Sequence, residues 1–151
     1  MKYFIGSDHA GIKIKEFVKE IFERNGHTVI DLGPFNDNRV DYPDFASKVC
    51  ESVLENEHSK GILICGTGLG MSMAANKYDG IRAALCHNEY SAAMAREHND
   101  ANILCLGERV SAEGIIEAII NSWETHKFQG GRHTGRVDKI NALSKMGSCR
   151  V

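Results

Sequence analysis

The sequence predicts an α/β fold with a five-stranded parallel sheet, and two observations support that prediction. Five short apolar runs alternate along the chain with segments whose apolar residues recur every three or four positions. Continuous apolar runs are typical of strands buried on both faces, and their alternation with helices is typical of parallel sheets. Because 151 residues, 42% of them hydrophobic, suit one core, we expect a single domain over residues 1–151. Its expected architecture is a Rossmann-like three-layer sandwich.

The first half of the chain contains three of the expected strands. They lie at residues 2–6, 27–33 and 61–66, which read KYFIG, HTVIDLG and GILICG. Residues 11–25 are expected to form a helix with one apolar face, which the Asn-Gly pair at its end terminates. Polar residues 33–42 predict a loop. Pro43 suits the first turn of a second helix, which ends near residue 55.

The second half continues the alternation. Strands are expected at 80–86 and 101–107, which read GIRAALC and ANILCLG, and helices at 70–78, 88–98 and 111–126. A last helix begins near Gly135, because Val137, Ile140, Leu143 and Met146 follow at helical spacing. The double glycine upstream of it suggests an arm, so this C-terminal helix is expected to reach a partner subunit.

The composition sets limits on function. A net charge of -2 supplies no basic field for nucleic acid or an anionic membrane. No apolar run approaches the roughly 20 residues that span a bilayer, and MKYFIGSDHAG lacks the apolar core of a signal peptide. The cysteines are odd in number and form no CxxC pair, which favours reduced thiols in a cytoplasmic protein. They are Cys50, Cys65, Cys86, Cys105 and Cys149.

Polar residues follow several of the expected strands. Asp8 and His9 come after the first strand, Cys65 ends the third, and Cys86 and His87 end the fourth. Ligands bind open parallel sheets at the carboxyl ends of the strands, so a site is expected at this edge.

The segment ILICGTGLG, residues 62–70, contains the strongest candidate. Its glycines at alternate positions let the backbone turn sharply and approach a ligand closely. The loop leads into a helix, whose first amides favour an anion and stabilise the thiolate of Cys65 as a base or nucleophile. The alternatives are a plain strand-to-helix turn and a core cysteine.

Two further pairs of polar residues also have structural alternatives. Asp8 and His9 form an acid–imidazole pair, although Asp8 also suits a helix N-cap. His98 and Asn99 lie between a helix and the fifth strand, where a polar turn is the alternative. A metal site made from these histidines, Asp8 and Cys65 is not expected, because no pair has i,i+4 or CxxC spacing.

Arg132 and Arg136, in GGRHTGRVDK, are four residues apart and share a face where the chain is helical. Two guanidinium groups on one face suit a phosphate, and a solvated helix surface is the alternative. Together with the glycine loop, the thiol and the histidines, they indicate a small phosphorylated substrate and acid–base chemistry at carbon. A phosphate-ligand sensor without chemistry fits the same residues less specifically.

Six segments carry a resemblance to a known family: GSDHAG, DYPDFA, GILICGTGLGMSMAANK, GIRAALC, YSAAMAREHNDANILCLGERV and GGRHTGRV. Over residues 3–145 the sequence resembles the type B ribose-5-phosphate isomerases and their relatives that act on galactose 6-phosphate or allose 6-phosphate. The resemblance implies interconversion of D-ribose 5-phosphate and D-ribulose 5-phosphate through a cis-enediolate, in the non-oxidative pentose phosphate pathway. It implies neither metal nor cofactor.

The resemblance also implies roles for residues. Cys65 matches the catalytic base, and His98 matches the acid that opens the furanose ring, with Thr67 beside it. The glycine loop matches an oxyanion hole for the enediolate, which replaces the first expectation of a phosphate cradle. Arg109, Arg132 and Arg136 match phosphate contacts. The substrate-binding positions are Asp8, His9, Gly66, Thr67, Gly68, Leu69, Gly70, Asn99, Arg109, Arg132 and Arg136.

In this family the site is completed across a dimer interface, so the resemblance implies a homodimer, or a dimer of dimers, with a shared active site. No nucleic-acid or membrane partner is expected. Two alternatives stay open: an allose 6-phosphate or galactose 6-phosphate isomerase, and a non-catalytic sugar-phosphate binder of the same fold. Cys65, Thr67 and His98 together favour catalysis, because a binder needs none of them.

Overall fold

The computed structural model describes residues 1–147, and its five strands form one parallel sheet in the order β2-β1-β3-β5-β4. The chain winds from β1 to one side with β2, and then to the other side with β3, so the carboxyl ends of β1 and β3 flank the point of reversal. The strands are β1 (Lys2–Ser7), β2 (Thr28–Asp31), β3 (Lys60–Cys65), β4 (Ala83–Leu85) and β5 (Ile103–Gly107).

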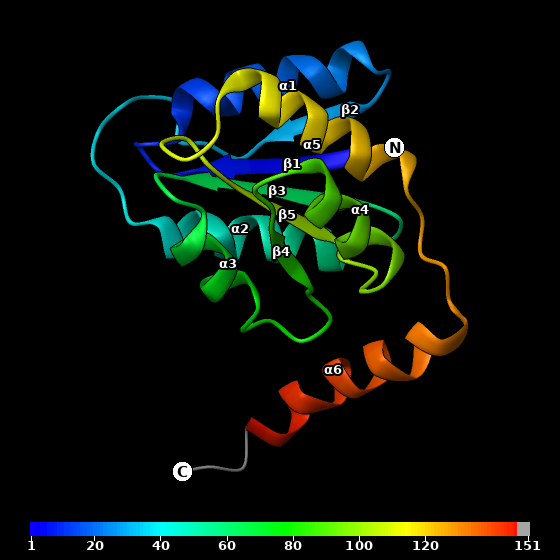
Figure 1. Ribbon diagram of the computed structural model, residues 1–151. Helices are drawn as coiled ribbons and strands as arrows, with labels where there is room; N and C mark the ends of the chain where they lie inside the picture. Colours follow the sequence, from blue (N-terminus) through cyan, green and yellow to red (C-terminus); the bar gives the residue numbers. More distant parts are fainter. Residues whose placement is uncertain (148–151) are drawn as a thin grey trace.

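Helices cover both faces of the sheet and make the three layers (Figure 1). One face carries α1 (Ile12–Arg24), α4 (Glu89–Glu97) and α5 (Glu113–Thr125). The opposite face carries α2 (Tyr42–Glu55) and α3 (Leu69–Ala75). A short 3-10 turn, η1 (Gly131–His133), precedes the last helix, α6 (Thr134–Gly147). The expected α/β fold with five parallel strands is therefore confirmed.

The core consists of two clusters, one on each face of the sheet. Successive side chains of a strand point to opposite faces, so Ile62 and Ile64 of β3 pack under α1, α4 and α5. Leu63 and Cys65 pack against α2 and α3. The continuous apolar run of β3 thus reflects burial on both faces.

The two edge strands are shorter than the sequence predicts. The expected strands at 27–33 and 80–86 shrink to four and three residues. Before β4, backbone groups bond to the side chain of Asn102, which accepts the Arg82 N–H (2.8 Å) and donates to the Gly80 carbonyl (2.8 Å). The Asn102 side chain therefore makes hydrogen bonds that the main chain of a neighbouring strand would otherwise make. The spacing of apolar residues does not predict such a replacement.

A buried lysine anchors the polar loop that follows β2. The Nζ atom of Lys15, on α1, donates to Asp31 Oδ1 (2.9 Å) and to the Pro34 carbonyl (2.7 Å), with its side chain fully buried. Breaking a buried pair of this kind costs about 3–5 kcal/mol. The start of the loop is therefore held firmly beside the carboxyl end of β1.

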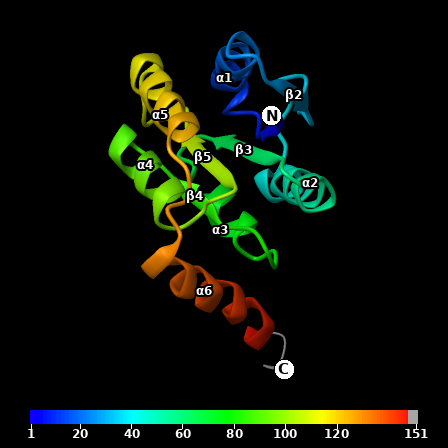
Figure 2. The same ribbon diagram turned by 90° about the vertical axis from the view of Figure 1, so that its right-hand side faces the viewer.

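The last helix stands apart from the layers (Figures 1 and 2). A side-chain contact joins α6 to the body where Arg82 Nη1 donates to Asn141 Oδ1 at 3.2 Å. Ile140 and Leu143 on α6 are 42% and 65% exposed, which leaves apolar surface uncovered within this chain. None of the helices within residues 1–147 has the length and hydropathy of a membrane-spanning segment.

Candidate active site

Cys65 is the last residue of β3, and the glycine loop begins immediately after it. The Gly68 amide donates a hydrogen bond to Cys65 Sγ at 3.1 Å. This contact places a backbone donor at the Cys65 sulfur atom. The side chain of Cys65 is 5% exposed, so this sulfur lies at the base of the loop and not on the open surface.

The backbone conformation and the close packing at position 68 favour glycine over every other residue. Its φ of 78° is left-handed, and a Cβ atom there would lie 2.5 Å from Leu85 Cδ1 and 3.0 Å from the Leu106 carbonyl. Glycine is the residue that adopts this conformation without steric cost. The backbone turn that places the Gly68 amide against Cys65 therefore requires a residue without a side chain.

Two side chains from other elements cover the loop. The Arg109 guanidinium lies against Gly66, since a Cβ there would come within 3.3 Å of its Nη1. The ring of Tyr42, at the start of α2, lies against Gly70, where a Cβ would come within 2.6 Å of it. Tyr42 was absent from the residues inferred from the sequence, although it stands in the segment DYPDFA.

Asp8 and His9 lie after β1, at the same edge. The Asp8 amide donates to the Ile64 carbonyl (3.1 Å), and Asp8 Oδ1 accepts from the Ala10 amide (2.9 Å). Asp8 therefore shapes the turn before α1 but does not cap the helix, whose N-cap is Gly11. His9 Nδ1 lies 3.2 Å from the Val40 carbonyl and 3.3 Å from its amide, which ties His9 to the polar loop.

These residues form what we call the carboxyl-edge group. Thr67 and Leu69 are exposed at the tip of the loop, and Thr67 Oγ1 accepts a hydrogen bond from the Leu69 amide at 3.3 Å. Within residues 1–147, no three His, Cys, Asp or Glu side chains are arranged to hold a metal ion. The group consists of Asp8, His9, Cys65, Gly66, Thr67, Gly68, Leu69, Gly70 and Arg109.

His98 and Asn99 lie at the opposite edge of the sheet. His98 is the C-cap of α4, and the chain then turns into β5. The Asn102 carbonyl, in that turn, accepts a hydrogen bond from the Gly61 amide at the start of β3. Since Gly61 is four residues before Cys65, the two edges are about 13 Å apart at the rise of a parallel strand.

The ring of His98 stacks on that of His133, with centroids 4.1 Å apart and planes 10° apart. His133, in η1, is 4% exposed, and its Nε2 accepts a hydrogen bond from Arg132 Nε at 3.3 Å. Burial lowers the pKa of His133, and the neighbouring His98, Arg132 and Arg136 lower that pKa further. These groups therefore favour the neutral form of His133.

The sequence reasoning missed His133, although this histidine stands between the two arginines that it singled out. Arg132 in η1 and Arg136 in α6 are both exposed, and both act electrostatically on His133. His98, Asn99, Arg132 and Arg136 thus form a second set, the amino-edge group. Within one chain, the amino-edge group lies at the opposite ends of the strands from the carboxyl-edge group.

Comparisons with known proteins agree with the fold described above. A family model described as Ribose/Galactose Isomerase matches residues 3–140. Escherichia coli ribose-5-phosphate isomerase B is 45% identical over 145 residues, which cover 95% of this chain and 97% of that protein.

Two solved structures are closely similar as well. Ribose-5-phosphate isomerase B of Clostridium thermocellum has a TM-score of 0.95 and 52% identity, covering 97% of this chain and 99% of that chain. The Thermotoga maritima enzyme has a TM-score of 0.90 and 48% identity, covering 93% of this chain and 97% of that chain. The chain therefore belongs to the ribose/galactose isomerase family.

Proposed function

We propose that this protein is an aldose–ketose isomerase that interconverts D-ribose 5-phosphate and D-ribulose 5-phosphate. The observation that carries the proposal is the hydrogen bond from the Gly68 amide to Cys65 Sγ at the base of the glycine loop. Relatives named ribose-5-phosphate isomerase B, which are 45% to 52% identical to this chain over 95% or more of its length, support the same activity.

Cys65 acts as the base on the open-chain sugar. Its thiolate takes the proton from C2 of the aldose, and the electrons of that C–H bond form the C1–C2 double bond of a cis-enediolate. The aldehyde oxygen at C1 carries the negative charge that results. The proton of the C2 hydroxyl passes to the oxygen on C1, and Cys65 returns its proton to C1, which yields the ketose. The reaction needs neither metal nor cofactor, because it only moves protons.

The amides of residues 66–70 stabilise the enediolate oxygen. Backbone N–H groups placed beforehand in a site with little water stabilise developing negative charge without reorganising. Glycines at alternate positions keep side chains away from the sugar. Tyr42 and Arg109, which lie against Gly70 and Gly66, form the walls of this part of the site.

The amino-edge group completes the site from a second copy of the chain. Ring opening needs an acid near the sugar, and phosphate binding needs cations, but His98, Arg132 and Arg136 lie at the far edge of the sheet from Cys65 within one chain. We infer a homodimer in which the partner subunit's His98 opens the furanose ring and the partner subunit's arginines bind the phosphate. The projecting α6, with Ile140 and Leu143 exposed, supports this assembly.

The thiols support a location in the cytoplasm. Cys50, Cys65, Cys86 and Cys105 are free and buried, and reduced thiols are typical of proteins in reducing compartments. Cys149 lies outside the described residues.

An assay on purified protein tests the proposed activity. Conversion of ribose 5-phosphate is compared with that of allose 6-phosphate and galactose 6-phosphate, at equal concentrations and with kcat/KM as the measure. We expect the highest kcat/KM with ribose 5-phosphate. A preference for one of the hexose phosphates would assign the protein to that substrate. Binding of all three sugars without turnover would identify a binder and overturn the proposal.

A further inference from the structure

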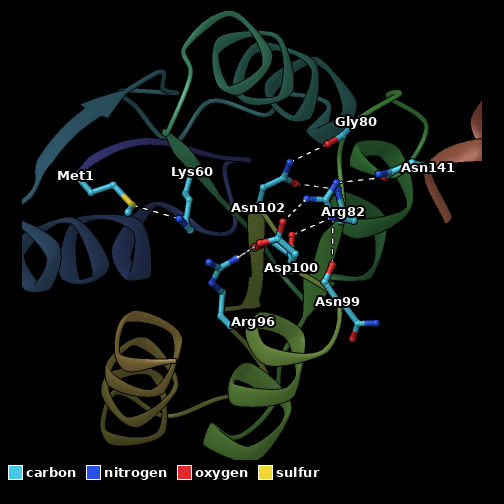
Figure 3. Close-up of polar contacts among 10 residues, drawn as sticks. Met1, Lys60, Gly80, Arg82, Arg96, Asn99, Asp100, Asn102 and Asn141 are labelled. Atoms are coloured by element: carbon cyan, nitrogen blue, oxygen red, sulfur yellow. Dashed lines mark hydrogen bonds and ion pairs between the residues drawn. The ribbon is translucent and has the colours of Figure 1, made fainter. Parts of the chain in front are cut away.

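Arg82 lies at the amino edge of the sheet and joins separate parts of the chain (Figure 3). Its Nε atom donates to the carbonyl oxygens of Asn99 (3.1 Å) and Asp100 (2.9 Å), and its Nη2 donates to Asp100 Oδ2 (3.1 Å). Its Nη1 donates to Asn141 Oδ1, on α6, at 3.2 Å. One planar guanidinium group therefore holds both the turn after α4 and the last helix.

The turn that Arg82 holds has a backbone that needs such support. Asp100 has a φ of 45°, in the left-handed region that residues with a side chain seldom adopt. Arg96 Nη1 lies 3.4 Å from Asp100 Oδ1, so two arginines hold this carboxylate. His98 and Asn99 directly precede Asp100, and their direction therefore depends on the same contacts.

Arg82 differs from an ordinary surface arginine in its burial. Its side chain is 15% exposed, whereas that of Arg24, which pairs with Glu117 across α1 and α5, is 65% exposed. Exposed pairs of the second kind contribute little to structure. The donors of Arg82 are directed at two carbonyl groups, a carboxylate and an amide, which only a forked side chain can reach together.

We propose that Arg82 is a positioning residue for the isomerase site. It fixes the position of the His98 and Asn99 backbone relative to α6, the helix that carries Arg136. Arg82 does not itself contact the sugar phosphate. The inference rests on the proposed function, in which His98 opens the ring and Arg136 binds the phosphate. Loss of the fork separates these two groups, and a displacement of about 1 Å from a distant support can lower a rate about 100-fold.

Steady-state kinetics on ribose 5-phosphate give the first test. We expect Arg82→Ala to lower kcat about 10- to 100-fold and to raise KM. Arg82→Lys keeps the charge but lacks the fork, so it recovers little of the loss. Asn141→Ala cuts the link to α6 and leaves the turn held, so KM rises while kcat stays within about twofold. Arg24→Ala, the matched control, leaves both constants unchanged.

A second measurement does not depend on activity. Stacked imidazole rings shift each other's NMR signals, so histidine-labelled protein reports the contact between His98 and His133. We expect Arg82→Ala and Arg82→Lys to move the signals of both rings, and Arg24→Ala to leave them in place. If the wild type shows no isomerase activity, the proposed function fails, and this measurement still decides whether Arg82 positions His98.

Several results would overturn the inference. Wild-type kcat and KM in folded Arg82→Ala would do so, whatever the ring signals show. Full activity in Arg82→Lys would show that charge alone is sufficient. If Arg82→Ala does not fold, Arg82→Lys and Asn141→Ala decide the matter, and wild-type constants in both would exclude a positioning role.

Discussion

The ring of His133 lies flat against that of His98, with 4.1 Å between their centroids. His133 is buried, and two arginines stand near it in the sequence. Arg132 Nε donates a hydrogen bond to His133 Nε2, and Arg136 follows three residues later. Two charged rings in this stack would repel each other, and the lowered pKa of His133 favours the neutral form of that ring.

The first prediction concerns the titration of His133. Burial and the neighbouring cations lower its pKa from the ordinary value of 6.5, so its NMR titration midpoint should fall below 6.5. Arg132→Ala removes one cation and should raise that midpoint towards 6.5. The exposed His58 provides the control, and its midpoint should not respond to Arg132→Ala. A midpoint at or above 6.5 in the wild type would contradict the prediction.

This shift also has a consequence for stability. Because the folded pKa is lowered, the unfolded chain binds the proton more readily, and stability is lost as pH falls through 6.5 towards the folded pKa. In His133→Gln that contribution is absent. The free energy of unfolding should therefore fall more steeply in the wild type than in His133→Gln when the pH is lowered across this window.

The second prediction concerns the base. Cys65→Ser replaces the thiol with a hydroxyl group that is far harder to deprotonate, so kcat should fall at least about 100-fold while substrate binding is largely kept. Cys86→Ser makes the same exchange in another buried cysteine and serves as control. Near-normal turnover in Cys65→Ser would show that another residue takes the proton.

The third prediction tests whether the site is shared between two copies. Cys65→Ser and His98→Asn should each be inactive, but a mixed dimer contains one site in which both residues are intact. Unfolding and refolding an equal mixture should restore about a quarter of the wild-type activity, since half of the dimers are mixed and each has one good site. No recovery would mean that Cys65 and His98 act from the same chain.

The fourth prediction separates ring opening from isomerisation. If His98 only opens the ring, His98→Asn should abolish turnover of ribose 5-phosphate, because the cyclic sugar must be opened first. It should spare the entry of solvent deuterium into an open-chain analogue that cannot cyclise. Mass spectrometry of the analogue measures that exchange. Equal losses in both assays would instead assign His98 to the enediol step or to the integrity of the site.

The fifth prediction concerns phosphate. Arg136→Ala should raise KM for ribose 5-phosphate more than it lowers kcat, because a grip on phosphate contributes mostly uniform binding. Unphosphorylated ribose should be nearly unaffected. Lys139→Ala, which removes another exposed cation from the same helix, should leave both constants unchanged. An unchanged KM in Arg136→Ala would make Arg132 and Arg136 a solvated helix surface.

The sequence by itself determined the layers and the local part of the site. Apolar runs such as residues 61–65, and the helical spacing in residues 12–24, are signals within a few consecutive residues. The contact between Cys65 and the Gly68 amide is equally local, because three residues separate the two. Such features follow from backbone geometry and from the period of the apolar positions.

Only the tertiary structure decided which distant residues meet. His133 stacks on His98, Tyr42 covers Gly70, and Arg109 lies over Gly66, although 28 or more residues separate the members of each pair. The short β4 likewise depends on Asn102, which takes the place of a strand neighbour.

The separation of Cys65 from His98 has the same origin. Residue types and spacing show that a thiol ends one strand and a histidine precedes another. Their distance depends on the direction in which those strands run in the sheet, and parallel packing places the end of β3 and the turn before β5 at opposite edges. Packing, which joins elements far apart in sequence, therefore determines that Cys65 and His98 lie far apart within one chain.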